Sequence, residues 1–465
     1  MNSLKRDGLS HLPDLSEADA NSCEIKRVFF YSIFLLLLLS LPAGPALAED
    51  HIKITPDVQV STGFTDNFFY MDSNKESDIY VKLSAGIPVI IPLYIRNLDM
   101  SMGYRINTIY HMQDHQYPDP TTQDPQDLNL DKFYVYHQFN LNLGLDKTFE
   151  ARDRRGRTLA FTLNDDVSTE TRVLRHSESD PLNLIQYNTL SLDLRYEHPF
   201  SRISELALNI SPSLKTYFDS GGNDHWDLDL GSRYRRKLRT GSPISMTAYF
   251  GMFMRTFDKE EEIPGNPDEN PCNWEKLGVY SYYGFKGTVG VELAYQRLTI
   301  ATAAGYEYDI YAAGNLDNNA DLVFDLKAMY SLFRSSTVDL MGTQAVMNNA
   351  AGEIMLSRIL RLRWTQSVGA KTQVIPEVAF STYESEAWGT FDRLGASVNV
   401  SYQIVRNLSV NLQFRLDQHS TGSSGRCKYE DDEWQDLIND WQAIRFLLGL
   451  KYQFKPIKFG IPREI

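Results

Sequence analysis

The chain has 465 residues, with 46 Lys and Arg against 60 Asp and Glu, so its formal net charge is −14. An acidic chain of this kind is a poor partner for nucleic acid, because a surface that binds phosphates needs clustered cations. Beyond the first 48 residues no apolar run approaches the ~18 residues of a membrane-spanning helix, which excludes helical membrane spans.

Residues 1–48 predict a cleaved secretory signal peptide. Residues 28–41 carry no charge and follow Lys26 and Arg27. This apolar run is too short to cross a hydrocarbon core of about 30 Å as a helix, and Ala46-Leu47-Ala48 follows it as a small-x-small cleavage site. We therefore expect cleavage near Ala48 and a single domain over residues 49–465.

From Ile54 onward, apolar and polar residues alternate over runs of about ten, the pattern of strands with two unlike faces. Residues 189–196 read T-L-S-L-D-L-R-Y, with the leucines and the tyrosine on one face. The same division recurs at 99–110, 227–234, 321–330, 394–402 and 408–417. A soluble sandwich also alternates, so the pattern alone does not decide which solvent the strands face.

The connections between the strands are alternately short and long. Short turns are expected near 199–205, 236–243, 296–298, 332–337, 365–371 and 404–408, and longer polar loops near 112–131, 165–186, 257–274 and 418–436. Outer-membrane barrels have tight periplasmic turns and longer external loops. The count predicts an all-β, transmembrane, antiparallel up-and-down barrel of about 18 strands, with 16 as the alternative and both termini in the periplasm.

Each strand that enters a short turn ends with an aromatic residue on its apolar face. Rings with an apolar body and a polar tip are favoured at the membrane interface, so one aromatic per repeat at one level predicts a girdle. The girdle residues are Tyr196, Tyr234, Tyr295, Tyr330, Trp364, Tyr402 and Tyr452.

The last strand, residues 443–454, contains Gly449-x-x-Tyr452-x-Phe454. This pattern resembles the insertion signal that the barrel-assembly machinery reads on terminal strands. It departs from that signal in two ways: Leu448 stands where a polar residue is usual, and a tail of residues 455–465 follows.

If the apolar face meets lipid, the polar face lines the lumen, and a register slip of one residue would invert this assignment. The cations expected there, as candidates for attracting an anionic solute, are Arg105, Arg195, Arg233, Arg235, Arg361, Arg363, Arg415, Arg445 and Lys451, together with Lys286 and Lys327. The acids expected there are Asp99, Asp193, Glu197, Asp227, Asp229, Glu292, Asp325 and Asp417. The alternative is that these charges only pair with one another across neighbouring strands.

No enzyme, metal site or cofactor is predicted. An envelope hydrolase would need a Ser/His or Asp/His constellation near the outer rim, whereas His111 and His115 belong to a strand that runs into a loop. Cys272 and Cys427 lie in polar stretches, where they form a disulfide or stay unpaired, since sequence alone cannot bring them within bridging distance.

The segment Ile54-Thr55-Pro56-x-Val58-x-Val60, followed by residues 64–69 (F-T-D-N-F-F) and Ser77-Asp78, resembles the opening of outer-membrane β-barrel porins encoded with exopolysaccharide and capsule systems of the exosortase type. The resemblance implies a role in exopolysaccharide export across the outer membrane of a Gram-negative bacterium, and it assigns no functional residues. The expected partners are membrane lipid, the assembly machinery, periplasmic export components, and a polysaccharide or small solute. The alternatives are a general diffusion porin or small-solute channel, and an occluded structural or adhesive surface barrel.

Overall fold

The computed structural model describes residues 51–67, 77–92, 98–113, 133–150, 156–171, 184–218, 224–257, 281–311, 319–348, 354–385, 389–421, 426–428, 434–436 and 441–460. The chain divides into two compact units, and all of these residues belong to the unit of Glu49–Leu93 and Asn97–Ile465. The other unit is Met1–Ala48 with Tyr94–Arg96. The expected signal peptide and its cleavage site near Ala48 therefore lie outside the described residues.

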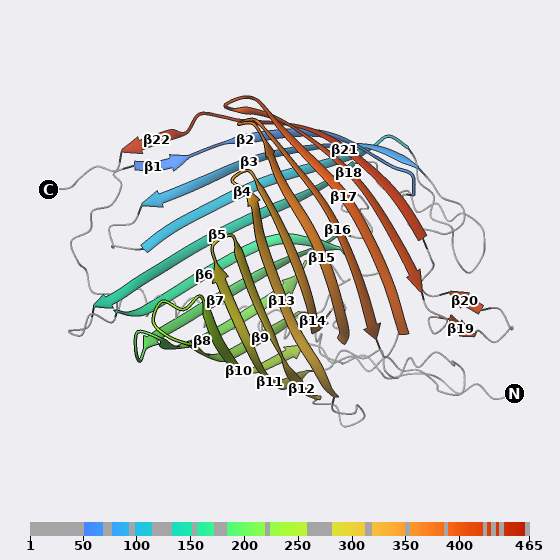
Figure 1. The fold of residues 1–465 in the computed structure, drawn as a ribbon. Helices are drawn as coiled ribbons and strands as arrows, with labels where there is room; N and C mark the ends of the chain where they lie inside the picture. Colours follow the sequence, from blue (N-terminus) through green and yellow to red (C-terminus); the bar gives the residue numbers. More distant parts are fainter. Residues whose placement is uncertain are drawn as a thin grey trace, which may run out of the picture. The chain divides into compact units, whose positions relative to one another are not determined.

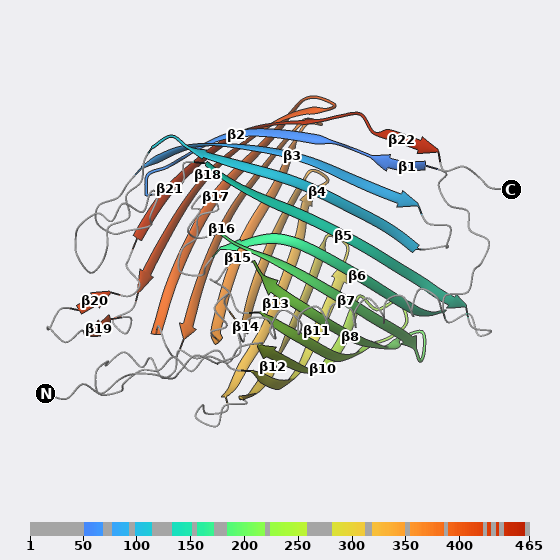
Figure 2. The same ribbon diagram turned by 180° about the vertical axis from the view of Figure 1, so that it is seen from behind.

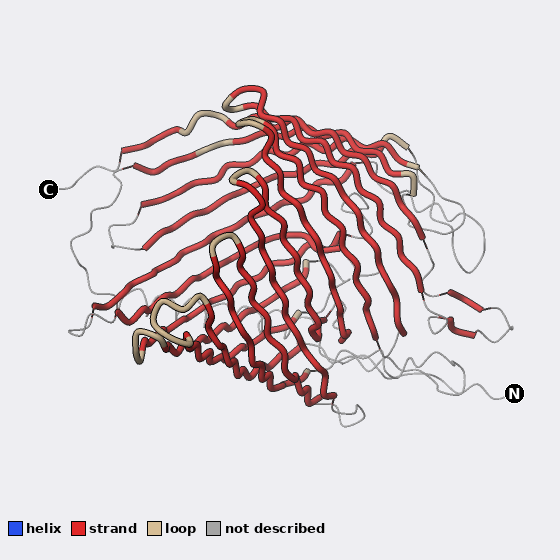
Figure 3. The backbone as a smooth tube through the Cα atoms, viewed as in Figure 1, coloured by secondary structure: helices blue, strands red, loops and turns tan. Residues whose placement is uncertain are grey.

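Over the described residues the fold consists of strands (Figures 1 and 3). They are β1 (His51–Ile54), β2 (Asp57–Thr65), β3 (Asp78–Pro92), β4 (Leu98–His111), β5 (Phe133–Glu150), β6 (Gly156–Thr171), β7 (Leu184–Pro199), β8 (Ser204–Tyr217), β9 (His225–Lys237), β10 (Ile244–Phe257), β11 (Tyr282–Tyr295), β12 (Leu298–Tyr311), β13 (Asn319–Phe333), β14 (Ser336–Asn348), β15 (Ile354–Val368), β16 (Thr372–Ser385), β17 (Gly389–Val405), β18 (Leu408–Thr421), β19 (Arg426–Lys428), β20 (Trp434–Asp436), β21 (Trp441–Gln453) and β22 (Ile457–Gly460). Within this part of the chain, no helix is long and apolar enough to cross a membrane.

The main sheet of 20 strands closes on itself, because β2 pairs antiparallel with β3 on one side and with β21 on the other. Pro56, which has no N–H, separates β1 from β2, and its carbonyl accepts a hydrogen bond from the N–H of Phe454 at 2.9 Å. The last strand is interrupted between β21 and β22 at the same level, so β1 pairs with β22 beyond this interruption (Figure 2). Counting β1 with β2 and β21 with β22, the wall has 18 strand positions. The prediction of 18 is confirmed, and the alternative of 16 is wrong.

The short turns fall where the sequence places them. The described ones span residues 200–203, 238–243, 296–297, 334–335, 369–371 and 406–407. Gly241 (φ 75°) and Gly369 (φ 66°) supply the left-handed backbone that two of these turns require. Gln296 (φ 50°) occupies the same region with a side chain, which is unfavourable for a non-glycine residue.

Two predicted loops need correction. Residues 165–171 belong to strand β6, and Asp166 pairs in register with Asn140 and Thr189. Loop composition misled the prediction, because a barrel strand keeps its ladder beyond the bilayer, where neither face has to be apolar. The predicted loop at 418–436 begins only after Thr421 and contains the short hairpin of β19 and β20.

The two faces of the wall differ in chemistry. In β2, Val60 is 45% exposed while Ser61 is 2% exposed, and exposed apolar side chains recur at alternate positions of most wall strands, although Leu143, Phe161 and Leu190 on the same face of β5, β6 and β7 are buried. We call the face with the exposed apolar side chains the outer face, and the other the inner face. A surface that presents Val, Leu, Phe and Tyr in this way suits a hydrocarbon solvent, and closure leaves no unpaired edge in it.

The seven expected girdle aromatics lie on the outer face toward the short-turn ends of their strands. Tyr330 pairs in register with Val338, which pairs in turn with Trp364, so these two rings stand at one level. The indole Nε1 of Trp364 donates to Ser336 Oγ at 2.8 Å. The outer face thus offers a row of rings where the short turns begin, and their contact with the membrane interface stays a prediction.

Candidate functional site: the inner face of the barrel

The inner face is fixed by the strand register. Arg415 of β18 pairs with Arg445 of β21, and Arg361 of β15 pairs with Ala379 of β16, all on the face opposite the exposed apolar residues. The same register places every residue that the sequence assigns to the lumen on the inner face: Arg105, Arg195, Arg233, Arg235, Lys286, Lys327, Arg361, Arg363, Arg415, Arg445, Lys451, Asp99, Asp193, Glu197, Asp227, Asp229, Glu292, Asp325 and Asp417.

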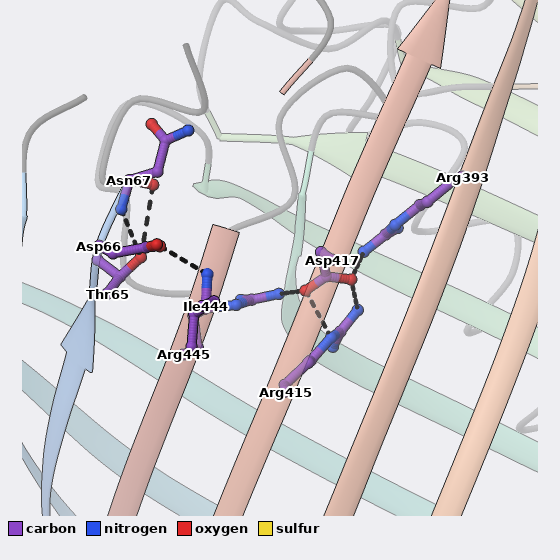
Figure 4. A network of polar contacts seen from close by, with 8 residues as sticks. All are labelled: Thr65, Asp66, Asn67, Arg393, Arg415, Asp417, Ile444 and Arg445. Carbon is purple, nitrogen blue, oxygen red and sulfur yellow. Dashed lines mark hydrogen bonds and ion pairs between the residues drawn. The ribbon is translucent and has the colours of Figure 1, made fainter. Parts of the chain in front are cut away.

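Three guanidinium groups converge on one carboxylate at the inner face of β17, β18 and β21 (Figure 4). Asp417 Oδ2 lies 2.5 Å from Arg445 Nη2 and 2.8 Å from Arg415 Nε, and Asp417 Oδ1 lies 3.0 Å from Arg393 Nη2. The Asp417 side chain is fully buried, and these contacts supply the opposite charge that a buried carboxylate requires. We call these four residues the Asp417 cluster.

A cavity of about 110 Å³ adjoins the Asp417 cluster. Its lining comes from β3, β4, β18 and β21 and consists of Tyr80, Lys82, Ile109, Gln413, Arg415, Arg445 and Leu447. Tyr80 and Ile109 pack with Tyr136 in a buried group that also contacts Leu447. The cavity therefore has an apolar side next to a cationic side.

Arg105 reaches across one whole strand to its partner. Its Nη2 lies 2.7 Å from Asp57 Oδ1 and 2.8 Å from Oδ2, with β3 between the two residues. A Cβ on Gly86 of β3 would come within 2.7 Å of that Nη2, so the guanidinium passes over a position without a side chain. Glycine is needed here for a close approach rather than for backbone freedom.

On the remaining wall most of the described inner-face cations form ion pairs, either with another strand or along their own strand. Arg255 Nε lies 2.5 Å from Asp227 Oδ1, and Lys286 Nζ lies 2.9 Å from Glu307 Oε2. Further pairs are Arg235 with Glu292 at 2.8 Å and Glu205 at 3.4 Å, Lys327 with Asp325 at 3.2 Å, Arg363 with Glu377 at 2.6 Å, Arg361 with Glu377 at 3.7 Å, and Arg195 with Glu197. Pairing between strands accounts for the contacts of Arg255, Lys286, Arg235, Arg361 and Arg363, whereas Lys327 and Arg195 pair two positions along their own strands.

The residues Thr65-Asp66-Asn67 connect the first wall strand to the last (Figure 4). Ile444 N donates to Asp66 Oδ1 at 2.6 Å, and Asp66 N donates to Ile444 O at 3.2 Å. Asn67 Nδ2 donates to Gln442 O at 3.0 Å. This segment therefore joins β2 to β21 at the seam where the barrel closes.

Asp78 of the Ser77-Asp78 pair lies 2.7 Å, through Oδ2, from His111 Nδ1, and both side chains are buried. His111 is therefore part of a strand-to-strand contact between β3 and β4, which agrees with its position at the end of a strand. Within the described part of the chain, no group of three His, Cys, Asp or Glu is placed to hold a metal ion.

The terminal strand carries the expected insertion residues in a modified setting. Gly449 and Tyr452 belong to β21, while Phe454 follows it and its ring meets that of Tyr452 edge to face at 4.9 Å between centroids. The tail beyond adds β22, so the last barrel strand is not the end of the chain. Cys427 lies in β19 and Cys272 lies outside the described residues, so their disulfide stays a prediction.

Sequence reasoning missed Arg393, Lys82 and Arg255 on the inner face. Arg393 directly precedes the alternating run 394–402, so extending that run by one position would have found it. Lys82 lies two positions before Ser84 on the polar parity of β3, a strand in which Pro88 and Pro92 obscure the alternation.

Closure, an even number of antiparallel wall strands, and an apolar outer face together define a barrel whose solvent is lipid. Barrels of this architecture occupy the outer membrane of Gram-negative bacteria. The chain is an outer-membrane β-barrel with a polar, charged interior.

No protein-family profile and no curated protein sequence matches the chain. Among solved structures it is similar to OccK9 (OpdG) of Pseudomonas aeruginosa, with a TM-score of 0.46, 9% identity, and coverage of 87% of this chain and 98% of that one. It is also similar to OccAB4 of Acinetobacter baumannii, with a TM-score of 0.43, 10% identity, and coverage of 88% of this chain and 100% of that one. A third similar structure is the FrpB iron transporter of Neisseria meningitidis, with a TM-score of 0.39, 8% identity, and coverage of 86% of this chain and 81% of that one.

Proposed function

We propose that this barrel is a water-filled outer-membrane channel that takes part in the export of an exopolysaccharide. The observation that carries the channel is the exposure of the charged side chains on the inner face. Lys327 is 63% and Asp325 45% exposed although they form an ion pair. Charged groups stay exposed inside a barrel when water reaches them, because burying them in a packed interior would be costly.

The assignment to exopolysaccharide export draws its support from the opening segment of the chain, residues 54–78, which resembles export-associated porins. The chemistry of the inner face suits such a substrate, since alternating cations, carboxylates and amides can exchange hydrogen bonds with the hydroxyl groups of a sugar chain. We further propose the barrel-assembly machinery and periplasmic export components as partners.

Two experiments test these proposals separately. The purified barrel, reconstituted in a planar lipid bilayer, should give stepwise single-channel conductance. A folded barrel without conductance would overturn the channel and favour an occluded structural or adhesive protein. The barrel is judged to be folded when the unheated protein migrates faster than the heated protein on a denaturing gel.

Deletion of the gene should reduce surface polysaccharide, and the chain expressed in trans should restore it. If the surface polysaccharide is unchanged while the purified protein conducts, export is wrong and a general diffusion or small-solute channel remains.

A further inference from the structure

We propose that the cavity beside the Asp417 cluster is a binding subsite for an acidic sugar unit, whose carboxylate lies against Lys82 and Arg415. The inference rests on the proposed function, because it names the class of monomer that the channel recognises. The cavity is lined by β3, β4, β18 and β21, so it lies at the inner face on either side of the barrel seam formed by β2.

The charge of the cavity lining selects an anion. Among the seven described residues that line it, Lys82, Arg415 and Arg445 are cationic and none is acidic. Asp417 lies behind them, and it holds three guanidiniums with one carboxylate. Within the Asp417 cluster and Lys82, positive charges therefore exceed negative ones, which favours a negatively charged ligand.

Arg415 is the guanidinium best placed to meet a ligand. Its side chain is 35% exposed, whereas those of Arg393 and Arg445 are 15% and 12% exposed. All three contact Asp417, so the cation that faces the lumen is already oriented before a ligand arrives. Orientation of this kind lowers the entropy lost on binding.

The remaining lining fits a sugar ring rather than a bare ion. Tyr80, Ile109 and Leu447 form an apolar side that can cover the C–H face of a ring, and Gln413 supplies an amide that can donate to and accept from hydroxyl groups. Lys82 Nζ lies 5.4 Å from the centroid of the Tyr136 ring, which places the ammonium at the edge of this apolar side. An inorganic anion would use the cations alone.

The test uses single-channel recording of the full mature barrel with trigalacturonate, maltotriose and sulfate as separate probes. We expect trigalacturonate to interrupt the current reversibly, and the neutral trisaccharide and sulfate at the same concentration to leave it unchanged. Equal interruption by maltotriose, or interruption by sulfate, would overturn recognition of an acidic sugar.

Lys82→Gln removes a cation that forms no ion pair with the described residues, so the barrel should fold and its conductance should persist. We expect the trigalacturonate concentration for half-maximal block to rise about 5-fold, and more in Lys82→Gln with Arg415→Gln, since each lost charge contact is worth about 1 kcal/mol. The matched control is Lys327→Gln with Arg195→Gln, which removes two inner-face cations of β13 and β7 and should leave the block unchanged.

The outcomes separate the two proposals. Absence of conductance contradicts the proposed channel. Conductance without block by trigalacturonate, or block that Lys82→Gln does not weaken, contradicts the subsite and leaves the channel standing.

Discussion

Asp417 illustrates how a charged side chain is stabilised when it is buried on the inner face of the barrel. Its carboxylate is fully buried and is contacted by guanidiniums from β17, β18 and β21. The Asp66 carboxylate acts differently, because it accepts a hydrogen bond from the backbone N–H of Ile444 and so takes the place of a ladder partner at the seam. In both cases an acidic side chain joins strands.

Asp417→Asn should lower the free energy of unfolding by about 3 kcal/mol, since it removes the only carboxylate of the Asp417 cluster and leaves three guanidiniums facing one another. Urea titration in detergent micelles, followed by tryptophan fluorescence, measures the change. The double variant Asp417→Asn with Arg415→Gln should lose less than the sum of the two single variants. Strictly additive losses would mean that Asp417 and Arg415 do not stabilise the barrel through their mutual contact.

Asp66→Ala should lower the free energy of unfolding by about 2 kcal/mol, because the N–H of Ile444 loses a charged acceptor. The matched control is Asp392→Ala, whose carboxylate accepts a hydrogen bond from the Thr382 hydroxyl at 2.7 Å, between β16 and β17. The midpoint of urea unfolding should fall more for Asp66→Ala than for the control. Equal shifts would argue against a special role for the seam.

At the scale of the elements, two hairpin turns of equal length differ in the backbone conformation that their residues adopt. The two-residue turns at 296–297 and 334–335 are equally short. Among the described non-glycine residues, positive φ occurs at Gln296. The β11–β12 hairpin therefore carries a local cost that its long ladder, from Tyr282↔Tyr311 to Tyr295↔Leu298, offsets.

Gln296→Val should destabilise the barrel by about 1 kcal/mol, because a β-branched side chain is poorly tolerated in the left-handed region. Gln296→Gly should have no such cost. Arg334→Val, in the turn between β13 and β14, is the matched control and should be neutral within about 0.5 kcal/mol. The comparison uses urea midpoints under the same conditions, and equal losses for the two valine variants would contradict the assignment of strain to Gln296.

At the scale of the whole molecule, a single strand places charged side chains on both the inner and the outer face of the wall. In β15, Arg361 and Arg363 contact Glu377 on the inner face, while Arg358 contacts Glu384 at 2.9 Å on the outer face. Exposed Leu360 and Leu362 share the outer face with Arg358. The position of a charged residue in the alternating pattern of its strand therefore determines whether its side chain faces the lumen, where it can act on an ion.

Replacing Arg361 and Arg363 by Glu should shift the channel toward cation selectivity, because it turns a group with two cations and one carboxylate into three carboxylates. The reversal potential in a KCl gradient measures the shift. Arg358→Glu, on the outer face of the same strand, should leave the reversal potential unchanged. An unaltered potential in the double variant, or an equal shift in the control, would contradict the inner-face assignment.

The sequence by itself determined the architecture, because alternation with a period of two, aromatic strand ends and short turns are local patterns that a closed barrel in lipid repeats around its wall. The same parity assigned Arg415, Arg445 and Asp417 to one face. The partners of these residues could not be predicted, because Arg393 and Arg105 reach their carboxylates across strands, and such contacts depend on register and on glycines such as Gly86.

Only the tertiary structure decided which side chains form the hydrogen bonds at the seam where the barrel closes. In the Thr65-Asp66-Asn67 segment, the side chains of Asp66 and Asn67 form hydrogen bonds with the backbone of β21, more than 370 residues away along the chain. Barrel closure brings the two ends of the chain together, and no local pattern encodes that distance. The same closure assembles the cavity at the Asp417 cluster, because it brings β3 and β4 near β18 and β21.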